Sequence, residues 1–192
     1  MSGDAPRMSA DAPAQHRAYA PKAIACAVLT VSDSRTVADD KSGQLIAELL
    51  RGAGHAVAVH EIVRDDAEAI REAVLRALAR ADVAALVATG GTGGSPRDVT
   101  PDTLEPLFEK RLDGFGELFR SLSYAEIGAA ALLSRATAGT LSGKIVYVMP
   151  GSSGAVRLGM EKLILPELAH VVGQLRRADA PPRAAAPPSG GR

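Results

Sequence analysis

The segment VAALVATGGTGGSPRDVTPD (residues 83–102) joins an apolar run to a glycine-rich turn and then to the start of a helix-like stretch. Glycine adopts positive φ angles freely and lets the backbone approach a ligand closely. Successive N–H groups in such a turn form an anion-binding concavity, and an adjoining helix N-terminus adds to the attraction for phosphate. The segment therefore predicts a phosphate-binding turn after a buried strand, formed by Thr89, Gly90, Gly91, Thr92 and Gly93.

An aspartate, Asp98, lies close behind this turn. Its carboxylate would repel bound phosphate unless a cation lay between them, so the pair predicts Mg²⁺ held by carboxylate and phosphate together. Asp65 follows another strand-like run and is the second expected ligand of that ion. An alternative stays open, in which Asp65 is only a solvent-exposed neighbour of a helix-capping Asp66.

Three further residues of the same segment are candidates for ligand binding, namely Arg97, Thr100 and Pro101. The last two equally suit the start of a helix, with Thr100 as N-cap and Pro101 in the first helical position. The two roles are compatible, so both are expected.

Apolar runs alternate with helix-like patterns along the chain. Strands are expected at residues 24–31, 57–63, 83–89 and 145–149. The run at 24–31 is apolar apart from one Thr, as is typical of a strand buried on both faces, and 57–63 is strand-like. Short helices are expected at 102–110 and 116–122, and the last helix should kink at Pro166. This order predicts an α/β fold with a single doubly wound, mostly parallel sheet and helices on both faces, in three layers.

Ligands of such sheets bind outside the carboxyl ends of the strands. Ser32 and Asp33 follow the first expected strand, and Pro150, Gly151 and Ser152 follow the run at 145–149. These residues are therefore expected to bind ligand next to the glycine turn. Glu117, within an unusual Gly-Phe-Gly-Glu sequence, is a weaker candidate. The serines do not lie in a GxSxG motif, which argues against a serine hydrolase.

The 192 residues suit one domain, expected at 22–177, between Ala- and Pro-rich tails at 1–21 and 178–192 that should be disordered. Lys+Arg and Asp+Glu are balanced at 22 each, which argues against a general nucleic-acid binder. The single cysteine, Cys26, lies in an apolar run and should be buried. No apolar run approaches the ~18 residues of a membrane span, and no signal peptide is evident, so a cytoplasmic protein is expected.

Several strings in this sequence resemble the MoaB/MogA family of molybdenum-cofactor biosynthesis proteins, more closely in its MoaB branch. They are spread over roughly residues 22–170: LTVSDSRT, DDKSG, TGGTG with RDVTPD, DGFGELFRSLSYAEIG, LLSRATAG and MPGSSGA. The resemblance implies a trimer, or two trimers stacked as a hexamer. It also implies molybdopterin, a dithiolene pterin, as a ligand.

The MogA branch is associated with adenylylation of molybdopterin, whereas some MoaB proteins have lost acidic site residues. This chain retains them at the matching positions, Asp98 and Asp65. The resemblance thus implies transfer of AMP from ATP, with Mg²⁺, to the terminal phosphate of molybdopterin. Asp98 and Asp65 would be the catalytic residues. A non-catalytic molybdopterin-binding or scaffold protein is the alternative.

Overall fold

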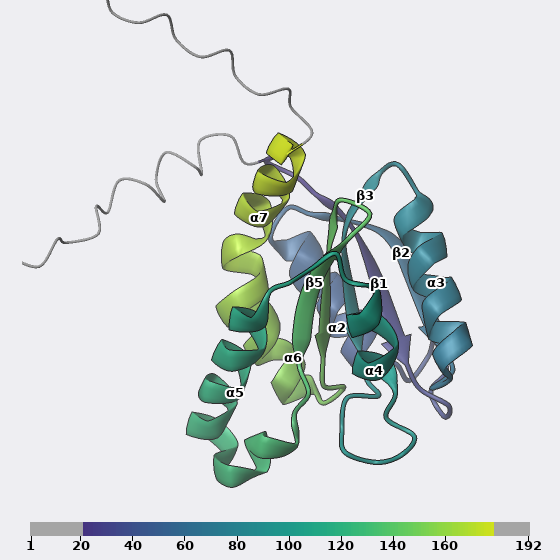
Figure 1. Cartoon of the computed structure of the whole chain (residues 1–192), viewed down its shortest axis with the longest axis vertical. Helices are drawn as coiled ribbons and strands as arrows, with labels where there is room; N and C mark the ends of the chain where they lie inside the picture. The colour runs from purple at the N-terminus through teal and green to yellow at the C-terminus, as the bar shows by residue number, and fades with distance from the viewer. Residues whose placement is uncertain (1–20, 179–192) are drawn as a thin grey trace, which may run out of the picture.

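The computed structural model describes residues 21–178 as a six-stranded sheet covered by helices (Figure 1). The strand order across the sheet is β2-β1-β3-β6-β5-β4. The strands are β1 (Ala25–Val31), β2 (Ala56–Val63), β3 (Val83–Thr89), β4 (Lys110–Arg111), β5 (Thr137–Leu141) and β6 (Lys144–Met149). The tails predicted to be disordered lie outside the described residues apart from residues 21 and 178, and the domain limits stay predictions.

The four strands expected from the sequence form the parallel part of the sheet. β1 pairs with β2 and β3, and β3 pairs with β6, all in parallel. β5 joins β6 as an antiparallel hairpin, and β4 adds two residues to the edge. The hairpin turn consists of Ser142 (φ 53°) and Gly143 (φ 68°), and two positive φ angles in succession match the twist of a two-residue hairpin loop. The mostly parallel sheet is confirmed.

Helices cover both faces of the sheet. One apolar core includes Cys26 and Val28 of β1 with side chains of α2 (Lys41–Gly52), α5 (Asp113–Ile127), α6 (Ser153–Gly159) and α7 (Leu165–Ala178). A second core includes Ala27 and Leu29 of the same strand with side chains of α3 (Ala67–Ala79) and α4 (Thr100–Leu104). Successive residues of a strand point to opposite faces, so these two cores establish the three-layer arrangement.

Two helix predictions were wrong in extent. The helix expected at 102–110 is α4 followed by a 3₁₀ turn, Glu105–Leu107, after which Lys110 and Arg111 pair with β5. Pro106 lacks the N–H that would continue the α-helix, which accounts for the early end. The helix expected at 116–122 extends over 113–127 instead, with Gly116 packed so closely that a Cβ would lie 2.5 Å from the carbonyl oxygen of Ala136.

The C-terminal helical run changes geometry near its proline. Met160–Ile164 forms a π-helical turn between α6 and α7, and Pro166 is the second residue of α7. Proline disturbs the preceding turn because it lacks an N–H and its ring crowds the carbonyl four residues earlier. The departure from α geometry therefore lies where the sequence placed a kink.

Two smaller expectations concern burial and membranes. Cys26 is a free, fully buried thiol, as predicted. Within residues 21–178, no helix combines the length and apolar character that crossing a bilayer demands.

Candidate functional site

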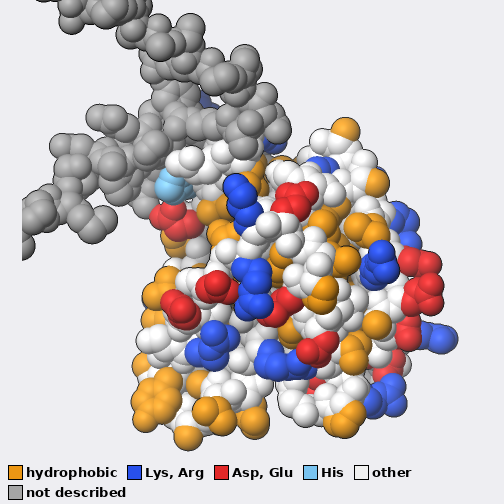
Figure 2. Space-filling view, in the orientation of Figure 1, with side chains coloured by type: hydrophobic (Ala, Val, Ile, Leu, Met, Phe, Trp, Pro, Cys, Tyr) orange, Lys and Arg blue, Asp and Glu red, His pale blue; other side chains and the backbone are white. Residues whose placement is uncertain are grey.

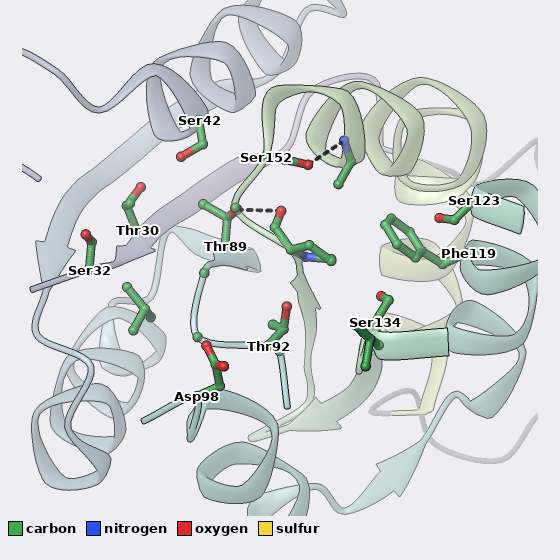
Figure 3. A pocket seen from close by; sticks show the side chains of 18 of the residues that line it. Thr30, Ser32, Ser42, Thr89, Thr92, Asp98, Phe119, Ser123, Ser134 and Ser152 are labelled. Carbon is green, nitrogen blue, oxygen red and sulfur yellow. Dashed lines mark hydrogen bonds between the residues drawn. The ribbon is translucent and has the colours of Figure 1, made fainter. Parts of the chain in front are cut away.

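A cavity of about 650 Å³ opens at the carboxyl ends of β1, β3 and β6 (Figure 3). In the strand order, β2 lies on one side of β1 and β3 on the other, so the order of the strands reverses at β1. Doubly wound sheets bind ligands at the carboxyl ends of the strands at such a switch point. Figure 3 shows Thr30, Ser32 and Ser42 on one side of the cavity and Phe119 and Ser123 of α5 on the other. The predicted residues that line it are Ser32, Thr89, Gly90, Gly91, Thr92, Gly93, Asp98, Pro150, Gly151 and Ser152.

The glycine turn presents unpaired amides to this cavity. Gly90 (φ +104°) donates its N–H to the carbonyl of Met149 at 3.1 Å, and a Cβ here would lie 2.2 Å from the carbonyl oxygen of Val31. The next three N–H groups, of Gly91, Thr92 and Gly93, donate to no acceptor in the described part of the chain. Backbone donors that line a cavity without a partner suit an anionic ligand.

Asp98 lies against this turn on its cavity side (Figure 3). Its Oδ2 accepts a hydrogen bond from the Ser95 amide at 2.9 Å, and a Cβ on Gly93 would lie 2.8 Å from the same oxygen. The absence of a side chain at Gly93 therefore allows the carboxylate to approach the backbone that would hold an anion.

Asp65 lies behind the turn and does not line the cavity. Its Oδ1 is buried without a hydrogen-bond partner, as is Thr100 Oγ1. Both oxygens face the place where a Cβ of Gly91 (φ +58°) would be, at 2.7 and 2.4 Å respectively. Burial raises the pKa of Asp65, and the nearby carboxylates of Asp98 and Asp33 raise it further. A backbone hydrogen bond from Val99 and the charge of Arg97 offset this only in part, and Oδ1 itself has no donor among the described residues.

These features can be tested against the expected Mg²⁺. Asp65 offers a buried carboxylate oxygen without a partner, and Asp98 offers a second carboxylate next to the glycine turn. Carboxylate oxygens are ligands of the kind that Mg²⁺ prefers. Among residues 21–178, no cluster of three or more acidic, histidine or cysteine side chains could hold a metal. The protein could supply only part of a coordination shell, which fits an ion that keeps waters and binds substrate phosphates.

An arginine that the sequence analysis did not select, Arg135, holds the glycine turn in place. Its Nε donates to the carbonyl of Gly93 at 2.9 Å, its Nη1 donates to Asp102 Oδ2 at 2.6 Å, and its Nη2 donates to the carbonyl of Asp98. Its own amide donates to the carbonyl of Thr92 at 3.2 Å. The string LLSRATAG contained this residue, but no local pattern indicates a partner some 40 residues away.

A second missed residue is Asp40, in the string DDKSG. Its side chain is 1% exposed and accepts hydrogen bonds from Thr30 Oγ1 at 2.7 Å, the Gly43 amide at 2.9 Å and Ser42 Oγ at 3.1 Å. His60 Nε2 lies 3.2 Å from the same carboxylate. Burial favours a higher pKa for Asp40, but these hydrogen bonds outweigh it and lower the pKa. Its neighbour Ser42 lines the cavity.

The remaining predicted residues do not line the cavity. Asp33 and Arg97 form an exposed ion pair that links the loop after β1 to the glycine turn, and Asp33 Oδ1 accepts from the Asp65 amide at 3.2 Å. Thr100 was wrongly predicted to be the N-cap of α4: Val99 is the N-cap, and Thr100 is buried in the first turn with its hydroxyl facing Gly91. Pro101 and Glu117 line a separate cavity of about 520 Å³. The lining of that cavity includes none of the residues 89–93, so Glu117 is not brought to the glycine turn.

The comparisons with known proteins agree with this geometry. A family model described as "Probable molybdopterin binding domain" matches residues 27–170. The chain belongs to the MoaB/MogA family of molybdenum-cofactor biosynthesis proteins. Molybdenum cofactor biosynthesis protein B of Bacillus anthracis is 54% identical over 164 residues, which cover 85% of this chain and 97% of the relative.

Solved structures place the chain in the MoaB branch of this family. A crystal structure of molybdenum cofactor biosynthesis protein B matches with a TM-score of 0.80 and 54% identity, covering 82% of this chain and 99% of that one. The tungsten cofactor synthesizing protein MoaB from Pyrococcus furiosus matches with a TM-score of 0.75 and 39% identity, again over 82% of this chain and 99% of the other.

Proposed function

We propose that this MoaB-branch chain transfers AMP from ATP to the terminal phosphate of molybdopterin and releases pyrophosphate. The observation that carries the proposal is a glycine turn with three unpaired amides, flanked by Asp98 and by a half-buried Asp65 whose Oδ1 has no hydrogen-bond partner. Those amides supply donors for phosphate oxygens. The two carboxylates supply ligands for the Mg²⁺ that accompanies ATP.

In the proposed reaction, an oxygen of the molybdopterin phosphate forms a bond to the α-phosphorus of ATP. The bond from that phosphorus to the bridging oxygen breaks, and pyrophosphate leaves with the electron pair. The amides of Gly91, Thr92 and Gly93 hold phosphate oxygens, and Asp98 and Asp65 would hold the Mg²⁺ that accompanies ATP. Magnesium, when bound, supplies positive charge opposite the negative charge that grows on the leaving group.

The proposed reaction uses no nucleophile from the protein. Burial raises the pKa of the only thiol, Cys26, to about 12, so it stays protonated at neutral pH. Catalysis then depends on positioning and charge neutralisation, which this turn and its carboxylates can supply.

The test measures pyrophosphate release from ATP, Mg²⁺ and molybdopterin. We expect Asp98→Asn to lower the rate by at least about 100-fold, since it removes one charge from the metal site, while molybdopterin binding persists. Asp82→Asn, at an exposed aspartate paired with Arg80, is the matched control and should leave the rate unchanged. Equal background rates in the wild type and Asp98→Asn would show that the chain does not catalyse the transfer.

The second candidate function is a non-catalytic molybdopterin-binding or scaffold protein. The description of the matching family model, which names binding and not transfer, favours it. Tight binding of molybdopterin together with no pyrophosphate release above background would select this function.

A homo-oligomer, trimer or hexamer, is also proposed. Large apolar side chains are exposed at the end of α5 and in the following 3₁₀ segment, Gly128–Leu133, and Figure 2 shows hydrophobic side chains gathered in this region. Tyr124, Ile127, Leu132 and Leu133 are each at least 60% exposed, a density that marks interaction surfaces. Light scattering at micromolar concentration checks the proposal, and a monomer would contradict it.

A further inference from the structure

Arg35, in the loop after β1, is the only positively charged side chain among the described residues that line the cavity. Its guanidinium spans two of the loops that form the site. Nη1 donates to Ser42 Oγ and lies 3.6 Å from Asp40 Oδ1, and Nη2 approaches the carbonyl oxygen of Gly151 at 3.5 Å. The side chain nevertheless remains 34% exposed, so a ligand in the cavity can reach it.

The buried Asp40 fixes the position of this arginine. Thr30, Ser42, Gly43 and His60 hold the carboxylate from two strands and a helix, so it cannot turn away. A guanidinium that is already oriented loses less side-chain entropy when it binds an anion. It also has five N–H donors, and its Nε–H has no acceptor within residues 21–178.

The two ends of the cavity differ in charge. Asp98 faces one end and would repel an anion that carries no metal ion, whereas Arg35 attracts such an anion at the other. Both ends are nevertheless close to the loop that contains Gly151. Gly151, whose carbonyl faces Arg35, lies so near the glycine turn that its Cβ would be 3.4 Å from the Cα of Gly90. An anion at Arg35 would therefore lie next to the phosphates held by the turn.

We propose that Arg35 binds the phosphate monoester of the acceptor pterin, and thereby selects phosphorylated over unphosphorylated acceptors. The inference rests on the proposed function for the identity of that acceptor. The forked N–H donors of a guanidinium suit a phosphate that carries no metal ion. The single ammonium group of a lysine matches such a phosphate less well. The glycine turn and the carboxylates are then left for the Mg²⁺–ATP phosphates.

The test compares equilibrium binding of molybdopterin, of a side-chain-dephosphorylated pterin and of Mg²⁺–ATP to the full-length chain. We expect Arg35→Gln to weaken molybdopterin binding about 10- to 100-fold, the range of a lost charge-assisted pair. Binding of the dephosphorylated pterin and of Mg²⁺–ATP should change by less than about twofold. Arg35→Lys, which keeps the charge but not the fork, should fall between wild type and Arg35→Gln.

Arg51→Gln, at an exposed arginine in the last turn of α2, is the matched control and should bind all three ligands as the wild type does. Loss of Mg²⁺–ATP affinity with unchanged molybdopterin affinity would assign Arg35 to the nucleotide and overturn the proposal. An unchanged affinity for molybdopterin would overturn it too. Because binding is measured without turnover, failure of AMP transfer and failure of this inference are separate results.

Discussion

Asp40 and Asp65 lie near the same end of the sheet, yet their surroundings are opposite. Asp40 has four hydrogen-bond partners for a buried carboxylate, and they lower its pKa. Asp65 has one buried oxygen without a partner, and burial and neighbouring acids raise its pKa. A fully paired buried acid stabilises the fold and positions its neighbours. An acid with one buried oxygen left unpaired lowers stability and suits a role in binding a cation.

The largest expected effect concerns the stabilising member of this pair. Asp40→Ala should lower the free energy of unfolding by about 3 kcal/mol or more at pH 7, because it leaves Thr30, Ser42 and His60 without their shared acceptor. Urea denaturation followed by circular dichroism measures it. Asp39→Ala, at the exposed neighbouring aspartate, should cost less than about 1 kcal/mol.

The pH dependence sharpens this prediction. The folded-state pKa of Asp40 is lowered, so its stabilising contribution is present above the unfolded-state pKa and is lost as pH falls through the folded-state value. The stability difference between wild type and Asp40→Ala should therefore narrow in acid. A difference that stays constant down to acid unfolding would mean that the charge of Asp40 contributes nothing.

At the other end of the cavity, Arg135 holds the loop that carries Asp98. Arg135→Ala removes donors to the carbonyls of Gly93 and Asp98, and displacement of the carboxylate should lower pyrophosphate release about 100-fold. The Mg²⁺ concentration for half-maximal rate should rise as well, which a purely structural role would not cause. Arg135→Lys should recover part of the loss.

The control for Arg135 is Arg157→Ala, which removes a surface ion pair with Glu161. It should change neither the rate of pyrophosphate release nor the Mg²⁺ concentration for half-maximal rate. An Arg135→Ala variant with normal magnesium dependence would show that the loop keeps Asp98 in place without this side chain.

A smaller effect is expected from the backbone of the turn. Gly91→Ala places a Cβ 2.4 Å from Thr100 Oγ1 and 2.7 Å from Asp65 Oδ1 at a positive φ, so it should cost about 1–3 kcal/mol and impair turnover. Gly94→Ala is its matched control, because a Cβ there meets nothing within 4 Å. Equal stability of the two variants would contradict the close packing of Asp65 against the turn.

The sequence predicted the central sheet well, because β1, β3 and β6 are buried on both faces and therefore appear as nearly continuous apolar runs. β3 has the expected limits, and β1 begins one residue later than predicted. β5, TAGTL, was missed because a short strand with a glycine and two threonines has no such run. β4 has only two residues, both exposed, and exists through its pairing with β5.

For the candidate site, the sequence located residues whose role is visible locally. The glycine turn and Asp98 are contiguous, and Ser152, Pro150 and Gly151 directly follow a strand, so the fold brings them together. Arg135 and Asp40 could not be selected, because an arginine or aspartate in a polar stretch resembles a solvated surface charge. Their roles depend on partners from distant segments, such as His60 in β2 for Asp40.

The smallest expected effect is a gain. Asp65→Asn should raise the free energy of unfolding at pH 7 by up to about 1 kcal/mol, because the wild-type carboxylate is ionised where burial and two other acids disfavour its charge. Since the folded-state pKa of Asp65 is raised, its destabilising effect grows as pH rises from the unfolded-state pKa to the folded-state pKa, and it vanishes below the unfolded-state pKa. The gain should thus disappear in acid, just as the loss in Asp40→Ala should narrow there, but the two effects have opposite sign. A loss of stability in Asp65→Asn at neutral pH would show that the carboxylate is held by partners, and the two aspartates would no longer differ in role.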